Sequence, residues 1–445
     1  MTAIGIGRRA VLLAPLAASL ASPAARAADP LPVIFVHGNG DTAGLWLTTL
    51  WRFESNGYPP DRLFALDLRT PQAGAVFDKP QAGRSMAAEV MQQLAAEVTR
   101  VKALTGAEKV VLVGQSRGGN TVRNYIKNGG GTAHTALAVL CGAVNHGVIV
   151  SDKVLIGSEF NGASAFMRDL NATPGEVVAG VRFATIRSDA NDKFAQPDGR
   201  YLGMPGVATG VGFEGPALAG AENIVIPGAD HREAGYGIAT FAPLFTLITG
   251  AAPTTLAITP QAAPVLDGKA SGFEAEAPTN IGLAGARVTI FQVDPATGMR
   301  MGGPVHDRIT GEDGVWGPFI ADPSANHEFV LAAPGAPITH IYRAPFPRST
   351  NLLHLRPQPF GKLDRDAASV LYMSRPRGYF GAGRDRVLLN GTPVTDVPAG
   401  VPTVSTTRLA GEAGQTVVGT FNDETIPART WPVATGHVSV IEITG

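Results

Sequence analysis

The chain has 445 residues, a formal net charge of −1 at pH 7 and 44% hydrophobic residues. Lys and Arg (36) nearly balance Asp and Glu (37), so no basic field favours a nucleic-acid partner. The apolar content is enough for a sizeable core, and the length allows two or three domains on a prior of roughly 150 residues each.

The first 27 residues have the features of an export signal. Paired arginines at 8–9 precede an apolar stretch at 10–20, and a small-x-small cleavage site follows at 25–27. This stretch is shorter than the ~20 residues that cross a bilayer, and no later segment has a transmembrane pattern. We therefore expect an exported protein, periplasmic or secreted. The paired arginines indicate the twin-arginine route, with ordinary secretion as the alternative.

Residues 28–250 alternate between short apolar runs and amphipathic stretches. The runs predict strands and are, in chain order, LPVIFVHG, RLFALDL, KVVLVG, TALAVLCGA, GVRFATIRS and AENIVIPG. The stretches between them predict helices, one of which is expected to have Ser85 as its N-cap and to stop at Gly106. Strands separated by helices imply the mostly parallel, doubly wound sheet of an α/β fold, covered on both faces.

From residue 251 onward the pattern changes to short alternating runs broken by Gly, Pro, Asn and Asp. Examples are GARVTIFQVDPATG, HEFVLAAPG, DRVLLNGTPV and GHVSVIEITG. Such runs predict an all-β region of sandwich or barrel type. We divide it at RAPFPRST, so the expected domains are an export signal (1–27), a catalytic domain (28–250) and two β domains (251–345 and 346–445).

The sequence GQSRG at 114–118 matches Gly-x-Ser-x-Gly, between a predicted strand and a predicted helix. That is the context of a nucleophile elbow, in which a sharp turn presents a serine hydroxyl at the carboxyl edge of the sheet. Ser116 is therefore the candidate nucleophile. The alternative is an ordinary glycine-rich turn between a strand and a helix.

A serine hydroxyl needs a base, and in this fold the chain order is Ser, then Asp or Glu, then His. His37 precedes Ser116, while His134 and His146 come too early to follow an acid on a later strand. Five further histidines lie in the β region. This elimination leaves His231, in the loop after IVIPG, as the candidate base. We expect His37 to order its loop rather than to act in catalysis.

The acid is expected on the loop after the preceding strand, where SDANDKFAQP offers Asp189 and Asp192. We favour Asp192, because it begins a D-x-F-x-x-P segment that can turn back toward the sheet, and keep Asp189 as the alternative acid. The residue that is not the acid is expected to brace the loop by an Asx turn. Asp230 ranks third, because side chains of neighbouring residues in an extended loop usually diverge.

Two backbone N–H groups are needed to stabilise the oxyanion of an ester-cleaving serine enzyme. One is expected at Arg117, directly after the nucleophile, and the other at Asn39 in VHGNG. No cluster has the spacing of a metal site, so we expect no metal and no cofactor. The single cysteine, Cys141, is flanked by apolar residues and is expected to be a buried thiol without a disulfide partner.

The motifs VIFVHGNG, VVLVGQSRGGN and IPGADH resemble those of the α/β-hydrolase lipases and esterases, in particular the class 2 bacterial lipase group, over residues 30–250. In the β region, HIYRAPFPRSTNLLHLRP and DRVLLNGTPV resemble the carboxy-terminal β domain of archaeal thermophilic long-chain lipases. SNGYPPDRLFALDL resembles their hydrolase domain. The resemblance implies ester or lipid substrates, with the β domain helping to bind lipid near the mouth of the site.

Two departures from those archaeal lipases stand out. They carry a long lid insertion after the second long strand, where this chain has the short RTPQAGAVFDKPQAGRS. Their catalytic acid lies on an earlier loop, where this chain has LCGAVNHG without a carboxylate. The acid is therefore expected on the later loop, and the Gly- and Pro-rich segment 193–222 is a candidate to overhang the site instead of a lid.

We therefore expect an exported serine ester hydrolase, a lipase or carboxylesterase, that cleaves fatty-acyl esters through a Ser-Asp-His triad and an acyl-enzyme. The β domains are expected to contact a lipid or polymer surface. One alternative is a polyester depolymerase, and another is a non-catalytic surface-binding protein on a hydrolase scaffold.

Overall fold

The computed structural model describes residues 29–172, 174–381, 383–397, 402–411 and 413–445. The expected export signal, residues 1–27, lies outside the described residues. Within the described part of the chain, no helix combines the length and the apolar character needed to cross a membrane.

Residues 29–250 are built on a six-stranded sheet of order β2-β1-β3-β4-β5-β8. Every neighbouring pair in it is parallel. The strands are β1 (Val33–Val36), β2 (Leu63–Leu66), β3 (Val110–Gln115), β4 (Thr135–Cys141), β5 (Arg182–Ser188) and β8 (Glu222–Ile226). This confirms the predicted parallel sheet of an α/β hydrolase.

Helices cover both faces of this sheet, because its strands carry apolar side chains on both sides. Phe35 packs with α1 and α6 on one face, whereas Ile34 and Val36 pack with α2 and α3 on the other. The helices are α1 (Leu47–Ser55), α2 (Ala87–Thr105), α3 (Arg117–Asn128), α4 (Ala165–Leu170), α5 (Glu233–Tyr236) and α6 (Ile238–Thr249).

The expected cap of α2 is wrong by one residue. The N-cap is Met86, whose N–H donates to the Glu89 carboxylate at 2.7 Å. Ser85 instead donates its hydroxyl to the Thr70 carbonyl at 2.6 Å and accepts from the Arg117 guanidinium at 2.9 Å. The Ser85 side chain therefore braces the loop that precedes α2.

The β region, residues 251–445, contains a seven-stranded sheet of order β13-β12-β15-β16-β23-β17-β20 and a four-stranded sheet of order β19-β18-β21-β22. Met373 and Ile441 of the larger sheet share a core with Val417 and Ile426 of the smaller one. The larger sheet comprises β12 (Arg287–Val293), β13 (His306–Ile309), β15 (Asn326–Ala332), β16 (Ile338–Arg343), β17 (Ser369–Ser374), β20 (Val404–Leu409) and β23 (His437–Glu442).

The smaller sheet comprises β18 (Val387–Leu389), β19 (Thr392–Pro393), β21 (Thr416–Phe421) and β22 (Glu424–Arg429). Two short antiparallel pairs join β10 (Ser271–Glu274) with β11 (Ala277–Gly282), and β9 (Val265–Leu266) with β14 (Phe319–Ile320). A β-rich C-terminal region is thus confirmed.

The last strand, β23, lies inside the seven-stranded sheet, between β16 and β17 and parallel to both. Strands from both sides of residue 345 therefore share one sheet. The proposed division of the β region at that residue stays a prediction.

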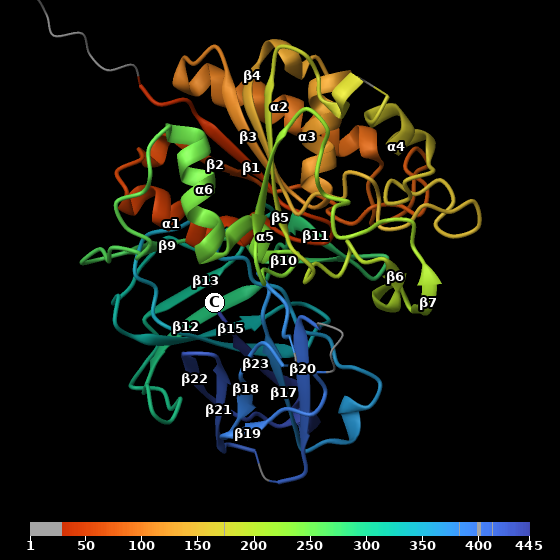
Figure 1. The fold of residues 1–445 in the computed structure, drawn as a ribbon. Helices are drawn as coiled ribbons and strands as arrows, with labels where there is room; N and C mark the ends of the chain where they lie inside the picture. Colours follow the sequence, from red (N-terminus) through yellow and green to blue (C-terminus); the bar gives the residue numbers. More distant parts are fainter. Residues whose placement is uncertain (1–28, 173, 382, 398–401, 412) are drawn as a thin grey trace, which may run out of the picture.

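The two halves of the chain pack against each other, with residues 29–250 above the β region in Figure 1. Helix α1 contributes to both cores. Its Phe53 packs in the core of the parallel sheet, while Leu47 and Trp51 pack with apolar residues of the β region such as Trp316. The indole N–H of Trp51 donates to the Ser349 carbonyl at 2.9 Å. Part of the interface is therefore a buried apolar core.

Candidate active site

Ser116 stands at the turn between β3 and α3, with φ 54° and ψ −123°. This left-handed conformation is uncommon for a residue other than glycine, and it marks the strained turn of a nucleophile elbow. A Cβ on Gly114 would lie 2.5 Å from the Gly118 carbonyl oxygen, and a Cβ on Gly118 would lie 2.4 Å from the Val36 oxygen. The two flanking glycines are therefore required for the strand, turn and helix to pack this closely.

His231 lies between Ser116 and Asp192 and contacts both. Its Nε2 is 2.8 Å from Ser116 Oγ, and its Nδ1 is 2.9 Å from Asp192 Oδ2. The exposed fractions are 8% for Ser116, 2% for His231 and 3% for Asp192, so the three groups are shielded from water. The structure thus brings together the serine, histidine and aspartate that the sequence singled out.

The histidine and the aspartate are each held by neighbouring groups. Gln115 donates its amide N–H to the His231 carbonyl at 3.0 Å, and the Phe194 ring lies edge-on to the imidazole at 4.7 Å between centroids. Asp192 Oδ1 accepts from the Phe194 N–H at 2.8 Å, which leaves Oδ2 for His231. These contacts restrict the rotamers on which the alignment depends.

The other two acidic residues near the site make different contacts. Asp189 is exposed, and its Oδ1 accepts from the Ala190 N–H at 2.6 Å and the Gly228 N–H at 3.2 Å. The hydrogen bond from Ala190 lowers the pKa of Asp189. This carboxylate therefore braces the loop. Asp230 Oδ2 instead accepts from Arg375 and from the Tyr379 N–H, both in the β region.

The loop after β1 packs directly on the nucleophile. A Cβ on Gly38 would lie 3.0 Å from Ser116 Cβ, so only glycine allows this approach. Within the described residues, neither the Asn39 N–H nor the Arg117 N–H donates to a protein acceptor. Asn39 is fixed through its side chain, whose Oδ1 accepts from the Ala73 N–H at 2.7 Å.

His37 is fully buried behind this loop. Its Nδ1 is 2.9 Å from the Gly38 carbonyl oxygen, and its Nε2 is 3.1 Å from the Leu68 nitrogen, which donates to it. Burial lowers the pKa of His37, in keeping with a neutral ring that donates on one side and accepts on the other. His37 therefore orders the loop, as expected.

The side chain of Arg117 has a role that sequence reasoning missed. Its guanidinium is fully buried, forms an ion pair of 2.6 Å with Glu159 and donates to the Pro71 carbonyl at 2.9 Å. It thereby ties the start of α3 to two loops beside Ser116. No pattern in the sequence pairs these residues, because Glu159 lies 42 positions away in an irregular loop.

Two of the loops near Ser116 expose large apolar side chains. The Val150 N–H donates to the Thr209 carbonyl at 2.7 Å, and Phe160, Phe194 and Met204 of the two loops pack against one buried cluster. Segment 193–222, with β6 (Asp198–Gly199) and β7 (Met204–Ala208), thus begins against the His231 ring. The exposed side chains, which we call the apolar rim, are Val150, Leu155, Ile156, Val207 and Phe213.

Among the described residues, no group of three or more His, Cys, Asp or Glu side chains is arranged to hold a metal ion. Cys141 is fully buried at the end of β4, and burial raises the pKa of its thiol. A buried, protonated thiol is a poor nucleophile, so Cys141 has a packing role.

Parts of the chain are similar to known lipases. Residues 30–199 match the family described as Lipase (class 2), and residues 263–360 match the Lipase C-terminal domain. The mature form of Bacillus licheniformis lipase BlEst2 is 18% identical with a TM-score of 0.39, covering 50% of this chain and 93% of its own. Aspergillus fumigatus lipase B is 15% identical with a TM-score of 0.37, covering 51% of this chain and 54% of its own.

The class 2 lipase match contains Asn39, Ser116 and Asp192, while His231 lies beyond its end. The parallel sheet and the β-rich second half agree with the two matches. The chain is an α/β-hydrolase of the lipase and esterase group, a carboxylic ester hydrolase with a C-terminal β region.

Proposed function

We propose that Ser116, His231 and Asp192 form the catalytic triad of this ester hydrolase. The observation that carries the proposal is the pair of hydrogen bonds from one imidazole, at 2.8 Å to Ser116 and 2.9 Å to Asp192. Asp192 holds the proton on Nδ1, which leaves Nε2 free to accept the hydroxyl proton of Ser116.

In this mechanism Ser116 Oγ attacks the ester carbonyl carbon while His231 Nε2 takes the hydroxyl proton. The tetrahedral intermediate collapses when His231 returns that proton to the leaving alcohol, and an acyl-enzyme remains on Ser116. Water, deprotonated by His231, then attacks the acyl carbon. The bond from that carbon to Ser116 Oγ breaks as His231 returns the proton to Oγ, which releases the carboxylic acid and restores the free serine.

We propose the backbone N–H groups of Arg117 and Asn39 as the oxyanion hole. Arg117 is the first residue of α3, where the orphan N–H groups of a helix favour negative charge. The close approach of Gly38 to Ser116 brings the Asn39 loop to the same side. Losing one such donor costs about 10²–10³ in turnover in serine enzymes.

For the substrate we propose fatty-acyl esters, on the strength of the apolar rim. Ile156 and Val207 have exposed fractions of 65% and 46%, and apolar side chains this exposed suit contact with an acyl chain or a lipid surface. The mature chain is proposed to reach such substrates after export directed by residues 1–27.

Labelling with a fluorophosphonate probe tests the triad directly. The unaltered protein is expected to become labelled on Ser116, and the Ser116→Ala variant is expected to remain unlabelled. A p-nitrophenyl ester series from butyrate to palmitate then tests the substrate class, with the highest kcat/KM expected on the longer chains. A preference for the shortest esters would contradict the fatty-acyl part of the proposal while leaving the triad intact.

A further inference from the structure

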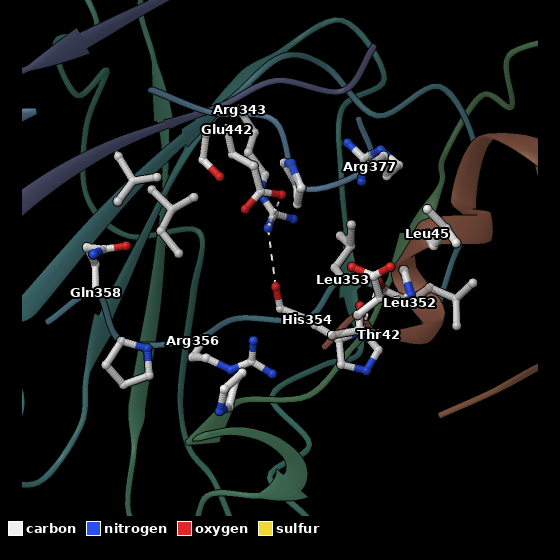
Figure 2. A pocket seen from close by; sticks show the side chains of 18 of the residues that line it. Thr42, Leu45, Arg343, Leu352, Leu353, His354, Arg356, Gln358, Arg377 and Glu442 are labelled. Atoms are coloured by element: carbon white, nitrogen blue, oxygen red, sulfur yellow. Dashed lines mark hydrogen bonds and ion pairs between the residues drawn. The ribbon is translucent and has the colours of Figure 1, made fainter. Parts of the chain in front are cut away.

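A pocket of about 410 Å³ lies between the two halves of the chain, and its lining contains none of the triad residues (Figure 2). The catalytic half contributes Asp41, Thr42 and Leu45, which follow the oxyanion loop in sequence. The β region contributes the remaining walls, including three arginines: Arg343, Arg356 and Arg377.

Arg343 projects into the middle of this interdomain pocket (Figure 2). Its side chain is 4% exposed and pairs with one carboxylate, Glu442, at 2.6 Å. The same nitrogen, Nη2, also donates to the His354 carbonyl at 3.3 Å. Its Nε is buried and has no acceptor among the described residues. The guanidinium of this lining residue therefore has an unsatisfied donor.

Arg356 and Arg377 are paired only with neutral groups. Arg356 donates to the Thr279 carbonyl at 2.8 Å and to Asn280 Oδ1 at 3.0 Å, while its Nε is buried without an acceptor in the described part of the chain. Arg377 donates to the carbonyls of Thr444 and Ile443, both at 3.0 Å. Burial lowers the pKa of both arginines, because each guanidinium is removed from water without a carboxylate of its own.

The carboxylates of the lining do not balance these cations. Glu442 is paired with Arg343, and Asp41 is paired with Arg232, which lies outside the lining. Of the three arginines, only Arg343 has a carboxylate partner in the lining, while Arg356 and Arg377 have none. Buried donors without acceptors cost free energy, and an oxyanion supplies the acceptors that a guanidinium fork fits best.

We propose that the interdomain pocket is a binding site for a compact oxyanion, a carboxylate or a phosphate group, held by Arg343, Arg356 and Arg377. Aliphatic walls that include Ile341 and Val440 leave room for a short apolar chain attached to that group. The site is separate from ester cleavage. Arg232, the neighbour of His231, donates to Asp41 and to the Pro376 carbonyl, and so stands at the border of the pocket.

Binding of inorganic phosphate, octanoate and octanol to the full chain tests the proposal, by calorimetry at constant ionic strength in sodium chloride. Saturable binding of phosphate and octanoate with equal affinity identifies the free anion as the ligand. Tighter binding of octanoate identifies an anionic amphiphile. Octanol has an eight-carbon chain like octanoate but carries no charge. It is expected to bind at least roughly tenfold more weakly than octanoate. Equal binding of octanol and octanoate, or no saturable binding of either anion, overturns the proposal.

The variant Arg356→Gln tests whether the anion binds in the interdomain pocket or elsewhere on the protein. It is expected to weaken anion binding roughly tenfold or more, since hydrogen bonds to charged groups are the strong ones. The matched control is Arg408→Gln, because Arg408 is 41% exposed, pairs with Asp364 and does not line the pocket. If Arg356→Gln leaves the affinity unchanged, the anion binds elsewhere and the proposal fails. No ester is present in this experiment, so its outcome is independent of the triad.

Discussion

Arg375 of the β region donates a hydrogen bond of 3.1 Å to Asp230, the residue that precedes His231. The side chains are 3% and 1% exposed, so the pair is buried. The Tyr379 N–H donates to the same carboxylate oxygen at 2.9 Å. The loop that carries the histidine is therefore held from the β side as well as by Gln115 from within the catalytic half.

Arg375→Met is expected to lower activity on every ester to a similar degree. The change leaves the buried Asp230 carboxylate without its main cation, and breaking a buried pair costs about 3–5 kcal/mol. We expect a lower Tm and a reduced kcat for both p-nitrophenyl butyrate and laurate. Arg408→Met serves as the control, because Arg408 is itself 41% exposed and its pair with Asp364 lies away from His231. A loss confined to laurate would instead assign Arg375 to substrate recognition.

Ser116→Ala is expected to abolish ester hydrolysis while the protein stays folded, because a smaller side chain meets no new atoms at the elbow. Turnover should fall toward the residual level of a triad enzyme without its nucleophile, about 10³–10⁴-fold above water. Circular dichroism and a melting curve check the fold. Wild-type turnover in the purified variant would remove Ser116 from the mechanism.

Asp192→Asn is expected to reduce turnover by about 10⁴, the loss seen when the orienting carboxylate of a protease triad is neutralised. The amide can no longer hold the proton on His231 Nδ1. Asp189→Asn is the matched control in the same loop, since Asp189 bonds only to loop N–H groups and the Ser188 hydroxyl. The ratio of the two kcat values is the measurement, and a larger loss for Asp189→Asn would move the acid there.

Gly118→Ala is expected to destabilise the fold strongly. The new methyl group would lie 2.4 Å from the backbone oxygen of Val36, at the end of β1, and 2.6 Å from that of His37, directly after it. Overpacking of this kind typically costs about 1–3 kcal/mol, with more where the backbone must shift. Gly106→Ala is the comparison, because φ is +69° there but no atom lies within 4 Å. Urea unfolding of both variants should show the larger loss at Gly118.

Ile156→Ser is expected to impair hydrolysis of long or emulsified esters and to spare short soluble ones. A distant part of a large substrate contributes binding energy that a short ester never has. Ile309→Ser is the control, since Ile309 is 62% exposed on β13 of the β region. The measurement is the ratio of kcat/KM on p-nitrophenyl laurate and butyrate. A uniform loss on both esters would count against a role of the apolar rim in substrate contact.

The fold of residues 29–250 could be predicted because its signals are local, and the grouping of Ser116, His231 and Asp192 could be predicted from the chain order expected of such a fold. The GQSRG turn encodes its own geometry, and the sheet order brings the ends of β3, β5 and β8 to one edge. The preference for Asp192 over Asp189 rested on the D-x-F-x-x-P segment that Asp192 begins, which can turn back toward the sheet. In the structure Asp189 turns toward the Gly228 N–H, and Asp192 turns toward His231.

Two kinds of contact could not be predicted: the residue that caps α2, and the side chains that pair across distant segments. Ser85 has the residue type of an N-cap, but the Glu89 side chain satisfies the Met86 N–H and leaves Ser85 to the loop. The pairs Arg117–Glu159 and Arg375–Asp230 join positions 42 and 145 residues apart. Such pairs depend on how helices, strands and loops pack against one another in three dimensions. A single sequence has no pattern that indicates which distant residues this packing brings together.

The central position of β23 determines when the loop that carries His231 gains its support from the β region during synthesis. Chains fold from the N-terminus as they are synthesised, so Ser116, Asp192 and His231 emerge from the ribosome well before residues 437–442. Until those residues arrive, β16 and β17 lack the strand that they share, and Arg375, which donates to the Gly445 carbonyl at 2.9 Å, lacks part of its support. The loop that carries His231 therefore gains its full support from the β region only after β23 has joined the larger sheet.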